Sequence, residues 1–227
     1  MGQNSRISVI IPTFNEEATI KACIESARRL SPFEIVVVDG GSTDRTREIA
    51  KETGAIVIRS PKGRGIQMNR GAAIAKGEIL LFLHADTLMP KTGISFPSES
   101  FNGHIGGFFK LKFDDNSLPT KLVELFANFR ARLFSLPYGD QAIFIKKDVF
   151  EKVGGFKEYP FLEDIDMAMR IRKFGKLKYI PLGVVASSRR LKKGYLLSPV
   201  FVSLRNVAIA LLFMLGVGPS NLAKLYK

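Results

Sequence analysis

The sequence is poor in the residues that build covalent or metal cross-links: it has one cysteine, two histidines and no tryptophan in 227 residues. A lone cysteine, Cys23, excludes an intrachain disulfide and a thiolate metal cluster. Because Cys23 falls on the apolar side of a helical pattern, we expect a buried, inert thiol rather than a nucleophile.

Two common nucleotide-binding signatures are missing. Gly63-x-Gly65 lacks the third glycine of the dinucleotide fingerprint, since Met68 stands in its place. The P-loop pattern G-x-x-x-x-G-K-[ST] does not occur either. A bound nucleotide would therefore be held in another way.

Acidic residues are scarce relative to basic ones, 21 against 34, which gives a net charge of +13. This surplus favours an anionic partner, such as nucleotide phosphates, acidic lipid headgroups or nucleic acid, without choosing among them. The composition is 46% hydrophobic and 10% aromatic, which excludes a disordered chain. The N-terminus shows no signal-peptide pattern, so we expect a cytoplasmic protein.

Strand and helix patterns alternate through the first half of the sequence. Unbroken apolar runs predict parallel strands covered on both faces, and the segments between them have helical spacing, the first helix being capped by Asn15. We expect an α/β fold in residues 1–190, with a Rossmann-type, mixed and mostly parallel sheet flanked by helices. The predicted strands are 6–11, 34–38, 55–58, 79–83, 106–113 and 141–145, and the later helices are 43–53, 65–76, 120–134 and 162–174.

The tail, residues 191–227, differs in composition and has an apolar stripe at helical spacing. Its longest apolar run, 207–218, is too short to cross a bilayer, which takes about 20 residues. We expect a helical tail with two alternatives. It packs on the domain or on a second subunit, as in a homodimer, or it lies on the inner face of the cell membrane. The second alternative draws on the basic cluster Arg189, Arg190, Lys192 and Lys193.

Polar groups follow the predicted parallel strands, at the edge where such sheets bind ligands. Asp86 comes directly after the apolar run 79–83, where an unpaired carboxylate is costly to bury. A divalent cation, Mn²⁺ or Mg²⁺, that bridges Asp86 to a diphosphate would satisfy it. The alternative is an acid that only caps the turn at Thr87. A second acidic site, 163–166, begins a helix, where it either complements the helix dipole or supplies a general base.

Together these segments resemble the family 2 glycosyltransferases of the GT-A fold, over about residues 6–180. The order and spacing of five marks carry the resemblance: 8–16 (SVIIPTFNE), 36–44 (VVVDGGSTD), 81–86 (LFLHAD), 154–156 (GGF) and 162–166 (LEDID). It implies an inverting glycosyltransferase of the hexosyltransferase type. Such an enzyme would move a single sugar from a UDP or GDP sugar to a hydroxyl or phosphate acceptor, which the apolar tail allows to be lipid-linked.

The resemblance also assigns roles to individual residues. Asp86 matches the last acid of the family's D-x-D motif and would hold the metal. Asp164 matches the acid proposed as base and would deprotonate the acceptor. The implied donor site comprises Pro12, Thr13, Glu16, Asp39, Arg64, Gln67 and Asp86.

Two features depart from the family pattern. His84 stands where the first acid of D-x-D is expected, and we interpret it as a buried or hydrogen-bonded histidine, with a metal ligand as the alternative. The Q-x-x-R-W signature of processive synthases is absent, and residues 187–191 lack its tryptophan. This absence favours transfer of one sugar over polymer synthesis, and Arg189 and Arg190 would instead clamp phosphate.

Two other functions explain part of the sequence. A nucleotidyltransferase shares the α/β architecture, but it usually carries a glycine-rich basic loop where residues 12–16 stand here. A nucleic-acid-binding domain explains the net charge but leaves Asp39, Asp86 and Asp164 without a role. We therefore expect a nucleotide-sugar donor and no nucleic-acid partner.

Overall fold

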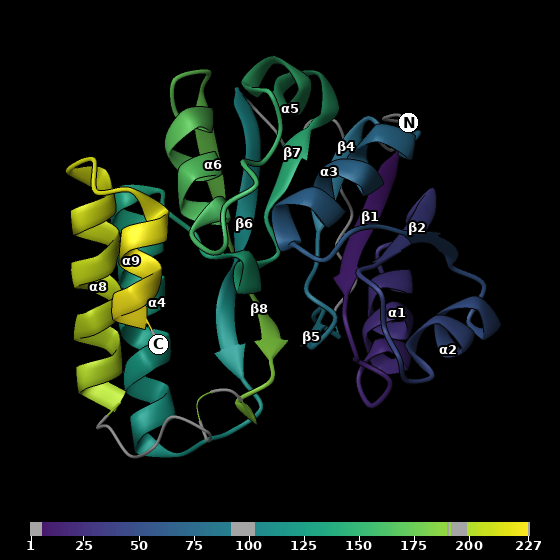
Figure 1. The fold of residues 1–227 in the computed structure, drawn as a ribbon, viewed down its shortest axis with the longest axis horizontal. Coiled ribbons are helices and arrows are strands. Elements are labelled where there is room, and N and C mark those ends of the chain that lie inside the picture. Colours follow the sequence, from purple (N-terminus) through teal and green to yellow (C-terminus); the bar gives the residue numbers. More distant parts are fainter. Residues whose placement is uncertain (1–5, 92–102, 190, 192–198, 227) are drawn as a thin grey trace.

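The computed structural model describes residues 6–91, 103–189, 191 and 199–226 (Figure 1). The described strands form an eight-stranded sheet in the order β3-β2-β1-β4-β7-β6-β8-β5. Arg190, Lys192 and Lys193, which the sequence places in a basic cluster, lie outside the described residues. The mixed, mostly parallel sheet flanked by helices confirms the predicted fold class.

The first half of the chain builds the parallel part of the sheet. The strands are β1 (Ile7–Thr13), β2 (Glu34–Asp39), β3 (Ile56–Arg59) and β4 (Ile79–Phe82). β1, β2 and β4 each pair on both sides, and nearly all of their side chains are buried on both faces, whereas β3 at the edge of the sheet is partly exposed. The helices between them are α1 (Ile20–Arg28), α2 (Thr46–Glu52) and α3 (Arg64–Ile74).

Two hydrophobic cores cover the two faces of this sheet. On one face Ile20 and Ile24 of α1 pack against strand residues such as Val9. On the other face α3 packs against β1 so closely that a Cβ at Gly71 would lie 2.5 Å from Ile10 Cγ2. Glycine at that position therefore lets α3 lie directly on the sheet.

The second half adds antiparallel and parallel strands beyond β4. The new strands are β5 (Thr87–Leu88), β6 (His104–Phe113), β7 (Phe144–Lys146) and β8 (Lys176–Ala186). β7 is antiparallel to β4 and β6, while β6 and β8 are parallel. The short strand β5 pairs antiparallel with the end of β8, with Thr87 opposite Ala186. This pairing joins the residues after β4 to those after β8.

Helices α8 and α9 lie alongside α4 at one side of the molecule (Figure 1). Ile209, Ala210 and Leu222 of this pair are buried against Phe161 and Ile165. No helix in the described part of the chain is both long and apolar enough to cross a bilayer. The helices of the second half are α4 (Leu118–Phe134), α5 (Lys147–Val153), α6 (Glu163–Ile171), α8 (Pro199–Met214) and α9 (Pro219–Tyr226).

Two local predictions were wrong. The helix α1 begins at Ile20, after Thr19, because Asn15 adopts a left-handed backbone (φ 54°) and its side chain accepts a hydrogen bond from the Thr43 backbone N–H instead. The first part of the predicted strand 141–145 is not a strand, because the backbone of Ala142 is also left-handed (φ 47°). A short 3-10 helix, η2 (Gly139–Gln141), precedes it, and strand β7 starts only at residue 144.

Candidate active site

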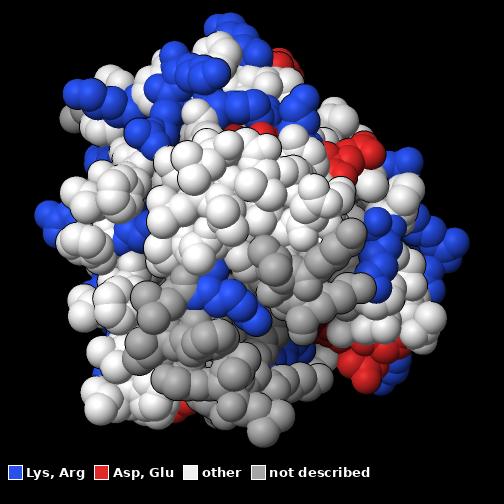
Figure 2. Space-filling view, turned by 60° about the vertical axis from the view of Figure 1, so that its left-hand side comes forward, with Lys and Arg blue, Asp and Glu red and all other residues white. Residues whose placement is uncertain are grey.

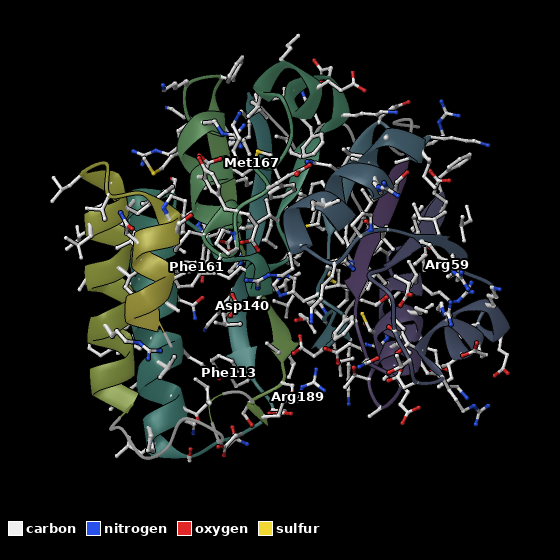
Figure 3. The ribbon with its side chains drawn as sticks, in the orientation of Figure 1. Arg59, Phe113, Asp140, Phe161, Met167 and Arg189 are labelled. Atoms are coloured by element: carbon white, nitrogen blue, oxygen red, sulfur yellow. The ribbon has the colours of Figure 1, made fainter. Side chains whose placement is uncertain are left out.

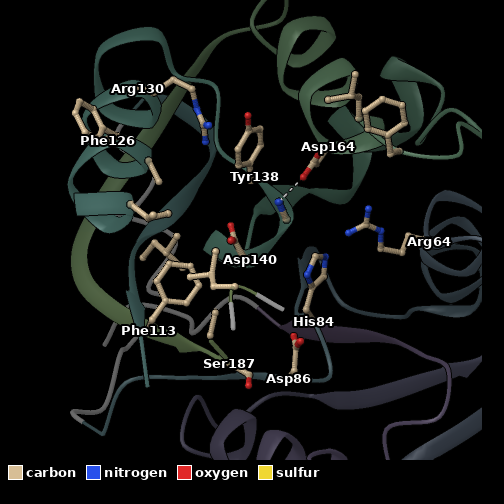
Figure 4. Close-up of a pocket in the computed structure, with 18 of the residues that line it drawn as sticks. Arg64, His84, Asp86, Phe113, Phe126, Arg130, Tyr138, Asp140, Asp164 and Ser187 are labelled. Atoms are coloured by element: carbon tan, nitrogen blue, oxygen red, sulfur yellow. Dashed lines mark hydrogen bonds between the residues drawn. The ribbon is translucent and has the colours of Figure 1, made fainter. Parts of the chain in front are cut away.

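A cavity of about 250 Å³ opens between the ends of the central strands and the helices α4 and α6 (Figure 4). Its polar wall brings together residues that lie far apart in the sequence. Figure 3 shows Asp140, Phe113 and Phe161 between the sheet and the C-terminal helices. The polar and charged lining comprises Arg64, His84, Asp86, Arg130, Tyr138, Asp140, Asp164 and Ser187.

Asp86 lies just after β4, where the pairing of β5 with β8 fixes it. The Ser187 backbone N–H donates to the Asp86 carbonyl oxygen at 3.0 Å. Two residues further on, the Arg189 guanidinium pairs with the Glu16 carboxylate and also lies 3.4 Å from Asp86 Oδ2. The hydrogen bond to Glu16 is the main reason that the pKa of Arg189 is raised. One cation therefore serves two of the acids predicted for the donor site.

Asp164 lies in the first turn of α6 and is held by two backbone groups. Its Oδ2 accepts a hydrogen bond from the Gly139 N–H at 2.5 Å, and its Oδ1 accepts from the Ile165 N–H at 2.8 Å (Figure 4). A Cβ at Gly139 would lie only 2.5 Å from His84 Nε2. Glycine at position 139 thus allows η2 to pass between His84 and Asp164.

Asp140, the next residue, was not predicted as a site residue. Its Oδ1 atom is buried and has no hydrogen-bond partner among the described residues. Burial first, and the nearby negative charge of Asp164 second, raise the pKa of Asp140 to about 6, although Arg130 partly offsets this. The one signal in the sequence is an acid beside a glycine, just before the apolar run that forms β7.

Arg64, which is partly exposed, forms an ion pair with the buried Glu163 at the edge of the cavity. Arg64 Nε lies 2.7 Å from Glu163 Oε1, and the Glu163 side chain is almost fully buried. Burial and the neighbouring Asp164 raise the pKa of Glu163 to about 7, against the opposing effect of Arg64. The pair ties the start of α3 to the start of α6, so Arg64 faces the cavity in a fixed position.

The other predicted donor residues form a separate network beside the cavity, at the ends of β1 and β2. The buried Asp39 carboxylate accepts hydrogen bonds from the Gly41 and Ser42 N–H groups, at 3.1 and 3.0 Å. Gln67 Nε2 donates to the carbonyl oxygens of Thr13 and Val38, at 2.8 and 2.7 Å. Pro12 is buried within β1. The structure thus groups Arg64, Asp86 and Asp164 in one cavity and places Pro12, Thr13, Asp39 and Gln67 next to it, with Glu16 joined through Arg189.

Cys23 is buried below this site. Its Sγ donates to the His84 carbonyl oxygen at 3.4 Å, and burial raises the pKa of its thiol. A protonated, buried thiol is a poor nucleophile, as the sequence predicted.

A metal could be held here only with help from a ligand. Within the described residues, no group of three His, Cys, Asp or Glu side chains is arranged to bind one. Asp86 is a partly buried carboxylate at the mouth of a strand, and Mg²⁺ and similar ions commonly take one or two carboxylates together with phosphate oxygens and water. The donor set therefore fits a cation that arrives with a diphosphate and does not fit a resident metal centre.

Comparison with known proteins gives consistent matches. The sequence profile described as "Glycosyl transferase family 2" matches residues 8–95. A PGL/p-HBAD biosynthesis glycosyltransferase of Mycobacterium tuberculosis is 30% identical over 181 residues, which cover 72% of this chain and 68% of that protein.

Solved structures show the same fold. Glucosyl-3-phosphoglycerate synthase from M. tuberculosis, in complex with Mn²⁺, UDP and phosphoglyceric acid, superposes with a TM-score of 0.63 at 21% identity and covers 94% of this chain and 80% of its own. S. aureus TarS 1–349 superposes with a TM-score of 0.59 at 20% identity and covers 91% of this chain. This chain spans only 65% of that TarS fragment.

The buried Asp140 predicts a pH-dependent stability. Its folded-state pKa of about 6 lies above the ordinary value of 3.8, so the folded protein binds the proton more tightly than the unfolded chain. This contribution is full below pH 4 and is lost as the pH rises through 6, at a cost of roughly 1–3 kcal/mol. We expect Asp140→Asn to remove this loss of stability. The free energy of unfolding of the variant, relative to that of the wild type, should therefore rise between pH 4 and pH 7.

Urea unfolding at a series of pH values measures this difference. Asp148→Asn is the matched control, because the Asp148 carboxylate is exposed. A stability difference between Asp140→Asn and wild type that does not change with pH would contradict the prediction.

Proposed function

Because the chain belongs to glycosyl transferase family 2, we propose that it transfers a single sugar from a nucleoside-diphosphate sugar to a hydroxyl or phosphate acceptor, with inversion at the anomeric carbon. The observation that carries this proposal is the single cavity in which Asp86 and Asp164 lie on different walls (Figure 4). The fold shared with a synthase bound to UDP and Mn²⁺ supports a donor of the UDP type, and a GDP sugar is the alternative.

The donor would occupy the side of the cavity that faces β1 and β2. Its nucleoside would lie near Pro12, Thr13 and Asp39, and its diphosphate would lie near Asp86 with Arg64 and Arg189 as the nearest cations. A divalent cation bound there, Mn²⁺ or Mg²⁺, would neutralise charge on the leaving nucleoside diphosphate. Arg189 now pairs with Glu16 and Asp86, so it is placed to turn towards phosphate oxygens when they arrive.

Asp164 is the proposed base. The N–H groups of Gly139 and Ile165 fix its carboxylate, and each carboxylate oxygen keeps a second lone pair for an acceptor hydroxyl. Asp164 would take the proton of that hydroxyl as its oxygen attacks the anomeric carbon from the side opposite the diphosphate. In-line attack from that side inverts the configuration.

The two other functions that the sequence left open receive less support. The mycobacterial relative described above is named as a glycosyltransferase. A nucleotidyltransferase would leave the Asp164–Gly139 contact without a task in the reaction. A nucleic-acid-binding domain would not need the carboxylates that line this cavity, because they repel phosphate.

We predict that Asp86→Ala abolishes the metal-stimulated part of nucleotide binding, because Asp86 is the protein ligand that links the cation to the diphosphate. In isothermal titration calorimetry, Mn²⁺ should tighten UDP binding to the wild type by roughly tenfold or more, about 1.4 kcal/mol per tenfold, and have no such effect on the variant. Asp148→Ala, which removes an exposed acid on α5, is the control. If Mn²⁺ still tightens UDP binding to Asp86→Ala as much as it does to the wild type, Asp86 is not the metal ligand.

For Asp164→Asn we expect donor binding to persist while turnover falls by about 10²–10⁴-fold, the usual contribution of a general base. The amide oxygen can still accept from the Gly139 N–H, so that contact between η2 and α6 is kept, while the hydrogen bond from the Ile165 N–H is lost. UDP release from the nucleotide sugar measures turnover, and titration with UDP measures binding. Asp166→Asn is the control, since Asp166 lies in the same turn but pairs with Arg170. Near wild-type turnover in Asp164→Asn would exclude it as the base.

We further propose that the protein works at the inner face of the cell membrane, where a lipid-linked acceptor would be available. The exposed side of α8 and the residue that follows it support this, since Leu211 and Leu215 are 55% and 82% exposed in a chain of net charge +13. Removing the whole tail, 191–227, would also remove Leu222 and Ile209, which are buried against Phe161. Point substitutions therefore separate membrane binding from folding.

The variant Leu211→Glu/Leu215→Glu should sediment less with phosphatidylglycerol vesicles than the wild type, with unchanged UDP binding. Ile74→Glu, which alters an exposed apolar residue on α3, should sediment like the wild type. If the wild type does not sediment, and elutes as a dimer that the α8 variant breaks, this face joins two copies in a homodimer instead.

A further inference from the structure

The cavity continues beyond the carboxylates into an apolar end. Phe113 of β6 and Val123, Phe126 and Ala127 of α4 form one wall of this end. Val207 and Ile209 of α8 also line the cavity. The same cavity therefore offers a charged end for chemistry and an apolar end that the proposed reaction does not use.

Two buried polar atoms without partners lie where these ends meet. Among the described residues, neither Arg130 Nη2 nor Asp140 Oδ1 has a hydrogen-bond partner. Arg130 is held in place, because its guanidinium carbon lies 3.4 Å from the centroid of the Tyr138 ring and its Nε donates to the Leu136 carbonyl oxygen at 3.3 Å. A buried polar atom without a hydrogen bond is unfavourable, so the cavity favours a ligand that supplies both an acceptor and a donor.

The apolar end is open to the surface. Phe126 is 50% exposed and Val207 is 39% exposed, although both line the cavity. Phe129 of α4 and Leu211 of α8 continue the exposed apolar surface, at 62% and 55%. Figure 2 shows a broad area of uncharged side chains on this side of the molecule, with Lys and Arg gathered around its rim. An elongated apolar group could enter the cavity from this face.

We infer that the acceptor is a neutral, hydroxyl-bearing amphiphile, whose head group lies between Arg130 and Asp140 and whose apolar body lies between α4 and α8. This inference rests on the proposed function and decides between its two acceptor classes. A head-group hydroxyl other than the one that Asp164 deprotonates satisfies both buried atoms, since its oxygen accepts from Arg130 and its hydrogen is donated to Asp140. A fully ionised phosphate has no hydrogen to donate and satisfies Arg130 alone.

Electrostatics also disfavours a phosphate head group at this position. Its charge would lie next to Asp140 and near Asp164, in a site of low dielectric constant. The other cations of the site are already paired, Arg64 with Glu163 and Arg189 with Glu16 and Asp86. A neutral head group leaves that balance of charges unchanged.

Calorimetric titration with simple probes below their micelle concentrations tests the inference. Octyl β-D-glucopyranoside carries hydroxyls on an alkyl chain, octyl phosphate carries an anion on the same chain, and glucose lacks the chain. We expect the wild type to bind octyl glucoside at least about tenfold more tightly than either of the others, a difference of about 1.4 kcal/mol or more.

Two neighbouring phenylalanines of α4 give a matched pair of variants. Phe126→Asp should weaken octyl glucoside binding by about tenfold or more, because Phe126 lines the cavity. Phe129→Asp should leave it unchanged, since Phe129 is exposed on the same helix but lies outside the lining. Asp140→Asn should tighten octyl phosphate binding, because it removes the like charge.

Two outcomes of these titrations would contradict the inference. Equal loss of binding in the two phenylalanine variants, or octyl phosphate binding as tight as octyl glucoside in the wild type, would overturn the inference. UDP and GDP titrated against the same proteins test the proposed function separately. Absence of binding of both nucleotides to the wild type would overturn that function, whereas the ranking of the three probes decides the chemistry of the apolar end alone.

Discussion

Three carboxylates, Asp86, Asp140 and Asp164, line one cavity, and a fourth, Glu163, is buried beside it. Holding so much negative charge in a partly dehydrated space is unfavourable unless cations or hydrogen-bond donors compensate. Arg64 compensates Glu163, Arg189 compensates Asp86 together with Glu16, and two backbone N–H groups compensate Asp164. Asp140 receives the least compensation, and its raised pKa reflects that.

These compensating contacts also explain how the two halves of the chain are joined. Arg189 and Glu16 are separated by 173 positions in the sequence, and Arg64 reaches Glu163 from α3 to α6. The parallel half supplies the residues assigned to the donor, and the half after β5 supplies Asp140, Asp164 and the apolar wall. The site therefore forms only when both halves fold against each other.

Much of the parallel half could be predicted from the sequence. Strands β1, β2 and β4 are apolar on both faces, so runs of consecutive apolar residues predict that they are buried. Asp39 and Asp86 could be predicted as site residues because they stand where those strands end. Strand β8 was missed, because it is half exposed and contains lysines and Pro181, so its pairing with β6 depends on distant residues. Asp140 was missed for a similar reason, since only η2 and the left-handed Ala142 turn it into the cavity. The role of Arg189 as partner to both Glu16 and Asp86 depends on the β5–β8 pairing, which cannot be predicted from the local sequence.

The close approach of η2 to its neighbours has an evolutionary consequence. Any side chain at residue 139 would collide with the His84 ring, and displacement of η2 would move Asp140 and break the hydrogen bond to Asp164. The end of the cavity that carries the carboxylates is therefore a poor place for mutations to accumulate. The wall formed by α4 and α8 has exposed residues on one side and the cavity on the other, so it can change size and shape at little cost to the fold. Under the proposed function, related enzymes should diverge in acceptor preference through that wall while the residues around η2 stay the same.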